Sequence, residues 1–326
     1  MKRIHGCTPE ALEFISQWFD DSPFVTAHTS GSTGAPKEIQ LLKSDMRTSA
    51  LSTNRYFNIT EQSTLVCPLS AGYIAGKMMI VRAIISGAEL WMEKPSNKPM
   101  TRDYGHVDLI AVVPSQVPHL LSNPENRLIP ENILIGGTPL PGDIASEIIA
   151  KGFNAFVSYG MTETCSHVAL RKVDNSSREV YEALNDIHFS TDMRNCLVIK
   201  SESRFFKQLA TNDIVKLLDD RHFTWLGRYD NVINSGGIKI YPEEIEQLIR
   251  DVIPSEIEYY IAKDTDDKWG EAPVLVISEK VDDMESLLSE VRAKVRSKAQ
   301  RPVKIIVDTI EHTSSGKIVR RSIKNQ

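Results

Sequence analysis

Short apolar strands alternate with helices through the middle of the chain, and this alternation constrains the fold more than any other feature. Strand-like apolar runs occur at residues 63–69, 89–92, 107–114, 131–137 and 154–160. Helix-like runs occur between several of them, at residues 76–88, 115–123 and 142–152. Because helices that connect parallel strands pack against the sheet, the pattern predicts an α/β fold with a mostly parallel sheet and helices on both faces.

The segment before this region predicts one helix and one strand. A helix is expected from Pro9, because Thr8 suits the N-cap and proline suits the first helical position. Leu12, Ile15 and Phe19 fall on one face of that helix, which we expect to be buried. Residues 24–27, FVTA, predict a short strand.

The pattern changes after Cys165. Residues 185–201 and 213–227 are typical of paired short strands with polar turns, which predicts a small antiparallel sheet or barrel. From residue 228 onward, two helical patterns and three apolar strands predict a compact α+β unit of about a hundred residues. We therefore expect a large domain at residues 1–227 and a small C-terminal domain at residues 228–326.

Charge and cysteine content exclude several kinds of partner. The chain has 38 basic and 43 acidic residues, a net charge of −5 and no long basic run, so neither nucleic acid nor a membrane is expected as a partner. The four cysteines lack metal-ligand spacing, which favours free thiols in a reducing, cytoplasmic setting. The sequence has no apolar leader and no run of membrane-spanning length, so we expect a soluble intracellular protein.

The stretch at residues 28–37, HTSGSTGAPK, is either a loop that holds phosphate or a flexible linker. Gly31 and Gly34 permit positive φ angles, which lets several backbone N–H groups point at one anion, and Lys37 adds a positive charge. Three hydroxyl donors lie among them, at Ser30, Ser32 and Thr33. The two glycines enclose only two residues, so the spacing excludes a Walker A loop. Composition alone favours a phosphate-binding loop only modestly over a flexible linker.

Three further motifs each have an ordinary structural explanation when taken singly. SYGMTE, residues 158–163, follows an apolar strand, where ligands bind in open α/β sheets, but it also fits a turn that caps a helix. GRYDNVINSGGIKIYPEEIE, residues 227–246, fits an ordinary hairpin followed by a helix start. TSSGKIVRRSI, residues 313–323, fits a solvated basic tail.

Taken together and in this order, the motifs resemble those of the acyl-adenylate-forming superfamily, which contains acyl-CoA synthetases, adenylation domains of peptide synthetases and luciferases. TSGSTGAPK is similar to the phosphate loop of that family, YGMTE to its Tyr-Gly-x-Thr-Glu motif, and SSGKIVRR to its C-terminal lysine motif. GGTPL at residues 136–140 is similar to the adenine-side loop, and Asp213 to the ribose aspartate. Residues 227–246 are similar to the hinge and the start of a small mobile domain.

The resemblance implies an AMP-forming acid–thiol ligase that uses ATP, Mg²⁺, coenzyme A and a small-molecule carboxylic acid. It assigns ATP binding to Thr29, Ser30, Gly31, Ser32, Thr33, Gly34, Lys37, Gly136, Gly137, Thr138, Ser158, Tyr159, Gly160, Asp213 and Arg228. It assigns catalysis to Lys317, Thr162 and Glu163, with Glu163 as the metal ligand. It assigns the hinge to Asp230, and the thioester-forming step to Ser235, Gly236 and Gly237.

The departures from the family pattern bear on the substrate. The phosphate loop begins at Thr29, whereas the family usually carries a further subdomain before it, so we expect that upstream subdomain to be missing. Ala71 and Tyr73 replace the aromatic or histidine residues found near the acyl pocket of many members, and Asn234 replaces a usual lysine.

The chain is similar to the CoA ligases of the family, including the o-succinylbenzoate–CoA ligases of menaquinone synthesis. That similarity suggests o-succinylbenzoate as the acid, with Lys77, Arg82 or His119 as the partner of its second carboxylate. The alternatives are another aryl- or acyl-CoA ligase, a carrier-loading module, or a non-catalytic nucleotide-binding relative. The oligomeric state stays open, a homodimer included.

Overall fold

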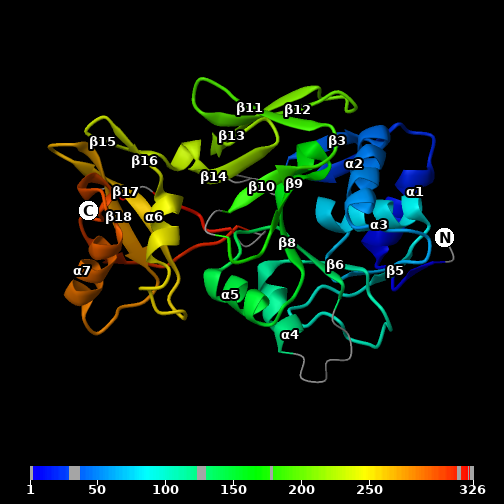
Figure 1. The fold of residues 1–326 in the computed structure, drawn as a ribbon, viewed down its shortest axis with the longest axis horizontal. Coiled ribbons are helices and arrows are strands. Elements are labelled where there is room, and N and C mark those ends of the chain that lie inside the picture. Colours follow the sequence, from blue (N-terminus) through cyan, green and yellow to red (C-terminus); the bar gives the residue numbers. More distant parts are fainter. Residues whose placement is uncertain are drawn as a thin grey trace. The chain divides into compact units, whose positions relative to one another are not determined.

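The computed structural model describes residues 3–28, 37–122, 130–176, 179–313, 317–321 and 323 (Figure 1). Residues 29–36 lie outside these ranges, so six predicted phosphate-binding residues stay predictions: Thr29, Ser30, Gly31, Ser32, Thr33 and Gly34.

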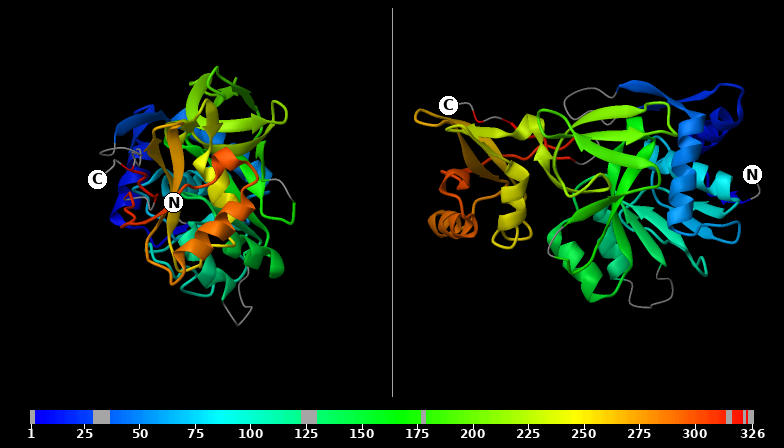
Figure 2. Two further views of the ribbon diagram at one scale, coloured as in Figure 1. Left: turned by 90° about the vertical axis from the view of Figure 1, so that its left-hand side faces the viewer. Right: turned by 45° about the horizontal axis from the view of Figure 1, so that its top comes forward.

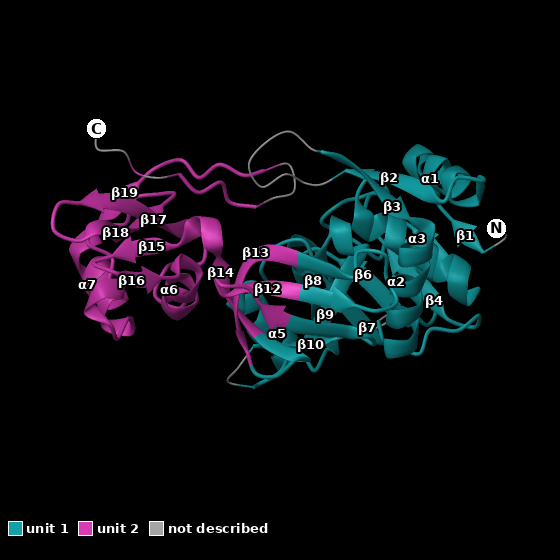
Figure 3. Cartoon of the chain, turned by 90° about the horizontal axis from the view of Figure 1, so that it is seen from above, with its two compact units in different colours: residues 1–189, 199–209, 218–223 teal, residues 190–198, 210–217, 224–326 magenta. Residues whose placement is uncertain are grey.

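The chain divides into two compact units, which are described separately (Figure 3). The first unit comprises residues 1–189, 199–209 and 218–223, and the second comprises residues 190–198, 210–217 and 224–326. This division is based on which residues contact one another. The boundary expected between residues 227 and 228 instead separates a large domain from a small domain that moves relative to it. That boundary therefore stays a prediction.

A mostly parallel sheet is the framework of the first unit. Its strands follow the order β1-β5-β4-β6-β7-β8, with every neighbouring pair parallel, and continue with the antiparallel strands β9 and β10. The bounds are β1 (Ile4–His5), β4 (Thr64–Cys67), β5 (Glu89–Met92), β6 (Leu109–Val112), β7 (Asn132–Ile135), β8 (Ala155–Met161), β9 (Ser166–Lys172) and β10 (Val180–Ala183). The predicted α/β class is confirmed.

Four further strands complete the order of this sheet as β14-β13-β12-β11, and the division between the two units runs across them. Their bounds are β11 (Ile187–Thr191), β12 (Cys196–Ser201), β13 (Gln208–Leu217) and β14 (His222–Arg228). They correspond to the paired short strands that the sequence predicts after Cys165.

Helices cover both faces of the parallel strands, as alternate side chains of one strand demonstrate. Leu65 and Cys67 of β4 belong to an apolar cluster with residues of α1, α2 and α3, whereas Val66 belongs to a cluster with residues of α4 and α5. Successive residues of a strand point to opposite faces, so both faces are buried. The helices are α1 (Pro9–Phe19), α2 (Lys43–Tyr56), α3 (Ile74–Ser86), α4 (Val117–Leu121) and α5 (Gly142–Ala150), with a 3₁₀ helix η1 (Pro114–Gln116) before α4.

Helix α1 begins as the sequence predicts but buries a different face. The Thr8 hydroxyl accepts a hydrogen bond from Ala11 N, as an N-cap should. The buried residues are Ala11, Phe14, Ile15 and Trp18. Leu12 and Phe19 are each 58% exposed, so the predicted face is wrong. The helix carries more apolar side chains than one face can bury, and the larger Trp18 lies on the buried one.

The predicted strand at residues 24–27 is part of a separate hairpin. Strand β2 (Phe24–His28) pairs antiparallel with β3 (Glu38–Leu42), and His28 lies opposite Glu38. The segment between these two residues is the predicted phosphate loop, so the loop joins two strands that pair with each other.

The second unit contains a smaller sheet with the order β16-β15-β18-β17, and β19 pairs with β18. Helices α6 and α7 lie side by side (Figure 2) and pack on one face of this sheet, in a cluster that includes Ile249 and Val291. Ile310, Ile318 and Ile323 pack on the other face. The bounds are β15 (Ile233–Ser235), β16 (Ile238–Ile240), α6 (Pro242–Ile249), β17 (Tyr259–Asp266), β18 (Gly270–Ile277), α7 (Met284–Lys294) and β19 (Ile305–Val307), with 3₁₀ helices η3 (Tyr229–Asn231) and η4 (Lys298–Gln300).

None of the described helices combines the length and the apolar character needed to cross a membrane.

Candidate active site

The carboxyl ends of β7 and β8 bring two of the predicted motifs together in the first unit. Gly136 follows β7 directly, and Ser158 in β8 donates a hydrogen bond from its hydroxyl to Ile135 O at 3.0 Å. A Cβ atom on Gly136 would lie 2.6 Å from Ser158 Oγ, so a larger residue at this position would force the Ser158 hydroxyl to shift. Gly137 has a φ of 100°, in the region that favours glycine. The predicted adenine-side loop and the SYGMTE motif are therefore neighbours.

Strand β8 meets β9 through a tight turn that fixes the end of the SYGMTE motif. The register of the two strands shifts between Tyr159 and Gly160, and a Cβ atom on Gly160 would lie 2.3 Å from Ser166 O. The Tyr159 ring packs edge-to-face against Tyr181 and Phe223, with centroid distances of 5.8 and 5.1 Å. The glycine permits close approach of the two backbones, and the aromatic contacts orient Tyr159.

The turn after β8 is a 3₁₀ helix, η2 (Thr162–Thr164), and the chain then enters β9. The alternative in which Thr162 or Glu163 caps a helix is therefore wrong, because an antiparallel strand follows. Thr164 Oγ1 accepts from Met161 N at 3.0 Å and donates within the turn, and Cys165 N donates to Thr162 O at 2.9 Å. Thr162 is half-buried and Glu163 is exposed on this turn.

Two residues distant in sequence anchor this turn, and the sequence analysis missed both. The Arg204 side chain is 1% exposed, and its Nη1 donates to Thr164 O at 2.6 Å. Ser49 of α2 donates from its hydroxyl to Cys165 O at 3.0 Å. No spacing rule connects either residue with the motif, so only the fold reveals them. Both residues therefore bind the backbone of the turn that carries Thr162 and Glu163.

In the second unit, Asp213 of β13 and Arg228 at the end of β14 lie together. Arg228 Nη1 is 3.4 Å from Asp213 Oδ1, which also accepts a hydrogen bond from Trp225 Nε1 at 3.2 Å. Asp213 is buried and Arg228 is half-buried. An acceptor and a donor are thus placed side by side, an arrangement that suits the two hydroxyls of a ribose.

Asp230, the predicted hinge residue, contacts Arg228 of this pair and Asn212, which precedes Asp213. Its Oδ2 lies 3.3 Å from Arg228 Nη2 and accepts from Asn212 Nδ2 at 3.4 Å. Asn212 accepts in turn from Arg194 Nη1 at 3.0 Å. The side chain of Asp230 is exposed, which leaves room for a change of backbone conformation there.

The predicted thioester loop is the turn between β15 and β16. Gly236 and Gly237 have φ angles of 56° and 82°, the left-handed region in which glycine is favoured. Gly236 N donates to Trp269 O at 2.7 Å, and a Cβ atom on Gly236 would lie 2.6 Å from the Trp269 ring. Trp269 is a half-exposed aromatic side chain that the sequence analysis missed.

In the second unit, hydrogen bonds to Thr313 hold the backbone of Lys317. Thr313 N donates to Lys317 O at 2.8 Å, and Lys317 N donates to Thr313 Oγ1 at 3.1 Å. An antiparallel bridge between His312 and Ile318 lies next to these hydrogen bonds. The backbone of Lys317 is thus held, while its side chain is exposed.

A buried cation, Arg82, contacts a residue of β9 in the first unit. Arg82 of α3 is 1% exposed, and its guanidinium contacts Met79 Sδ, Ser166 Oγ and His167 Nδ1 at 3.3–3.5 Å. Within the described ranges no carboxylate forms an ion pair with it. Burial lowers the pKa of Arg82 to about 10, so the side chain is still charged at neutral pH.

His167 next to Arg82 is neutral. Burial, with the Arg82 charge as a smaller contribution, holds the pKa of His167 well below its usual value. Thr53 Oγ1 donates to Ser49 O and also lies 3.0 Å from His167 Nε2. A proton on Nε2 then leaves Nδ1 to accept from Arg82, which fits both contacts. His167 therefore does not offset the charge of Arg82.

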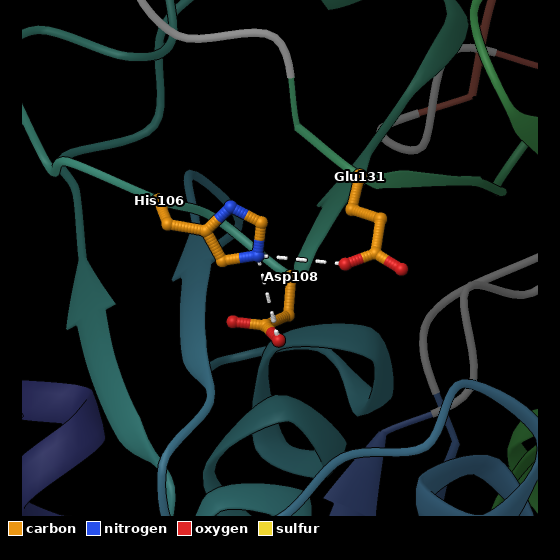
Figure 4. A group of neighbouring side chains, drawn as sticks. All are labelled: His106, Asp108 and Glu131. Carbon is orange, nitrogen blue, oxygen red and sulfur yellow. Dashed lines mark ion pairs between the residues drawn. The ribbon is translucent and has the colours of Figure 1, made fainter.

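A group with metal-ligating side chains lies near the amino ends of β6 and β7 (Figure 4). His106 Nε2 lies 3.7 Å from Asp108 Oδ1 and 3.4 Å from Glu131 Oε2. These residues precede β6 and β7, whereas Glu163 follows β8. The group is therefore separate from the predicted magnesium ligand.

Comparison with known proteins gives consistent results. The family model for AMP-binding enzymes matches residues 12–184. A 2-succinylbenzoate–CoA ligase from Listeria monocytogenes is 26% identical over 340 residues, covering 96% of this chain and 72% of the ligase.

Two solved structures are also similar. An acyl-CoA synthetase (AMP-forming)/AMP-acid ligase II-like protein from Dyadobacter fermentans matches with a TM-score of 0.64 and 33% identity, over 98% of this chain and 94% of that chain. An o-succinylbenzoate CoA synthetase from Bacillus subtilis, in complex with its acyl-adenylate intermediate, matches with a TM-score of 0.78 and 26% identity, over 90% of this chain and 67% of that chain.

Proposed function

Because this chain belongs to the family of AMP-binding enzymes, we propose that it is an AMP-forming acid–thiol ligase that converts o-succinylbenzoate to o-succinylbenzoyl-CoA in menaquinone synthesis. The match of the family model to residues 12–184 carries the proposal of the reaction. The similar ligases from Listeria monocytogenes and Bacillus subtilis support the acid.

The proposed reaction has two steps. A carboxylate oxygen of the acid attacks the α-phosphorus of ATP, the bond to the bridging oxygen breaks, and acyl-AMP and pyrophosphate form. The sulfur of coenzyme A, having lost its proton, then attacks the acyl carbon, and AMP leaves as the thioester forms. The first step gathers negative charge at the phosphates, so it needs positioned cations and N–H donors.

We assign the residues as follows. The segment from Thr29 to Lys37 would bind the β- and γ-phosphates, and Thr162 the α-phosphate. Asp213 and Arg228 would hold the ribose hydroxyls. Lys317 would bridge the α-phosphate and the substrate carboxylate, and Ser235, Gly236 and Gly237 would serve the second step after rotation about Asp230. The remaining adenine-side residues are Gly136, Gly137, Thr138, Ser158, Tyr159 and Gly160.

Glu163 fits as a ligand of Mg²⁺, which supplies positive charge against the phosphates when it is bound. Mg²⁺ usually keeps several waters and takes one or two carboxylates besides the phosphates of its substrate. An exposed carboxylate on an anchored turn meets that requirement.

Arg82 is the best candidate for the second carboxylate of o-succinylbenzoate. A buried charge without a partner is costly, and an anionic ligand would offset that cost. The ammonium of Lys77 already lies 4.7 Å from the centroid of the Phe14 ring, and burial lowers its pKa. His119 lies on α4, which packs on the other face of the sheet from α3.

A cytoplasmic location is part of the proposal. Its support is that all four cysteines are free thiols, as expected in a reducing compartment.

Release of pyrophosphate from ATP with a panel of acids, with and without coenzyme A, tests the proposal. We expect release with o-succinylbenzoate and thioester only when coenzyme A is present. Turnover with a different aryl or acyl acid alone would refute the substrate, and ATP binding without turnover of any acid would refute the reaction. Lys317→Ala should stop adenylation yet allow thioester formation from supplied acyl-AMP.

A further inference from the structure

Glu243 is a buried carboxylate between two segments that the proposed function places at the hinge and at the catalytic lysine. It lies in the first turn of α6 and is 6% exposed. Its Oε1 accepts a hydrogen bond from Asn231 Nδ2 at 2.5 Å, and Asn231 is the residue directly after the predicted hinge, Asp230.

The same oxygen of Glu243 also faces Arg320, three residues after Lys317. Arg320 Nε lies 3.8 Å from Glu243 Oε1. The same guanidinium forms a two-nitrogen ion pair with Glu246, in which Nη2 lies 2.7 Å from Oε2. Arg320 Nη1 also donates to Ile261 O at 3.2 Å, so the side chain is tied to both α6 and β17.

The second oxygen of Glu243, Oε2, is closely packed. A Cβ atom on Gly227 would lie 2.3 Å from Glu243 Oε2, so the backbone just before the hinge closes over the carboxylate. Glu243 Oε2 is buried and has no hydrogen-bond partner among the described residues. Burial raises the pKa of Glu243, and the charge of Arg320 opposes this shift.

We propose that Glu243 is a positioning residue that couples the hinge segment at Asn231 to the segment that carries Lys317. The inference rests on the proposed function for the roles of Asp230 and Lys317. A change of backbone conformation at the hinge displaces Asn231. Glu243 follows through its hydrogen bond with Asn231, and its contact with Arg320 transmits the displacement to the segment that carries Lys317. An ion pair that only stabilised the fold would not transmit movement from the hinge to Lys317.

Hydrogen exchange of the intact protein tests the coupling without any need for activity. Val319 N donates to Glu311 O and Ile323 N donates to Lys263 O, so their exchange reports on the Lys317 segment. Asn231→Ala should accelerate exchange in the peptide that contains these amides, roughly ten-fold. Lys294→Ala, which breaks the exposed Asp251–Lys294 pair of the same unit, should not. Unchanged exchange in Asn231→Ala would overturn the proposal.

Kinetics give the second test. ATP–pyrophosphate exchange should fall about ten-fold in Asn231→Ala and in Glu243→Gln, and the double variant should be no slower than the slower single variant. Thioester formation from supplied acyl-AMP should stay near wild type. Additive losses would contradict the coupling. A wild-type protein inactive with every acid would refute the proposed function, while hydrogen exchange would still decide the coupling.

Discussion

Arg228 Nη1 lies 3.4 Å from Asp213 Oδ1, and the same oxygen accepts a hydrogen bond from the indole of Trp225. The two residues are 15 positions apart in sequence and come from neighbouring strands. The carboxylate is largely buried, and these two donors help to orient it before any ligand binds.

Asp213→Asn should weaken ATP binding while it preserves the shape of the side chain. Hydrogen bonds that involve a charged group contribute about 1.5–3 kcal/mol, so the KM for ATP should rise roughly 10- to 150-fold. Initial rates of pyrophosphate release at varied ATP concentrations measure this. Asp219→Asn, in the turn between β13 and β14, is the matched control. Equal KM values in the two variants would contradict the ribose role.

Arg82→Met should lower the preference for an acid with two carboxylates. The KM for o-succinylbenzoate should rise roughly 10- to 150-fold, because a charged hydrogen bond is lost, while an aromatic acid with one carboxylate should be unaffected. Replacing a buried charge with an apolar side chain is often neutral or stabilising, so the variant should fold. Arg47→Met, at an exposed position of α2, is the control. Equal losses for both acids would exclude a direct contact with the second carboxylate.

Gly236→Ala should destabilise the second unit more than Gly237→Ala. Both glycines have positive φ, which costs an L-residue about 1–2 kcal/mol. Only the Gly236 variant also places a methyl group against the Trp269 ring, which adds about 1–3 kcal/mol. Chemical denaturation measures the difference. The double variant Gly236→Ala, Trp269→Ala should remove the steric part, and the same free energy of unfolding for both single variants would show that no clash exists.

Stability should fall in mild acid because of His167. Its pKa in the folded protein is well below its unfolded value of about 6.5, so the unfolded chain binds the proton first. The contribution of His167 to the free energy of unfolding is therefore fully present above pH 6.5. It declines as the pH falls towards the pKa of His167 in the folded protein, by up to about 1.4 kcal/mol per pH unit. Denaturation from pH 7.5 to 5 measures this slope. His167→Gln should flatten it, and an unchanged slope would assign the effect to other groups.

The parallel sheet could be predicted from the sequence because strand and helix alternate with clear breaks. The face of α1 could not, since Leu12, Ile15 and Phe19 satisfy helical spacing as well as Phe14 and Trp18 do. Only the neighbouring elements select which stripe is buried.

Within the candidate site, the family resemblance assigned Asp213 and Arg228 to one ribose, and the structure places their side chains in contact. The closeness of Gly136 and Ser158 was not predicted, and only the fold reveals it. The motifs could not identify Arg204 and Ser49. They act on the turn at Thr164 and Cys165 from 40 and 116 positions away, and no local pattern encodes such a contact. The same holds for Trp269, which meets Gly236 through the fold alone.

The anchored turn at Thr164 has an entropic consequence for the proposed metal ligand. A flexible carboxylate loses conformational freedom when it captures an ion, and that loss weakens binding. Thr164 and Arg204 restrict the backbone around Glu163 already in the unbound protein. Most of the ordering has thus taken place during folding, and each encounter with the ion needs little more than a rotation of the Glu163 side chain.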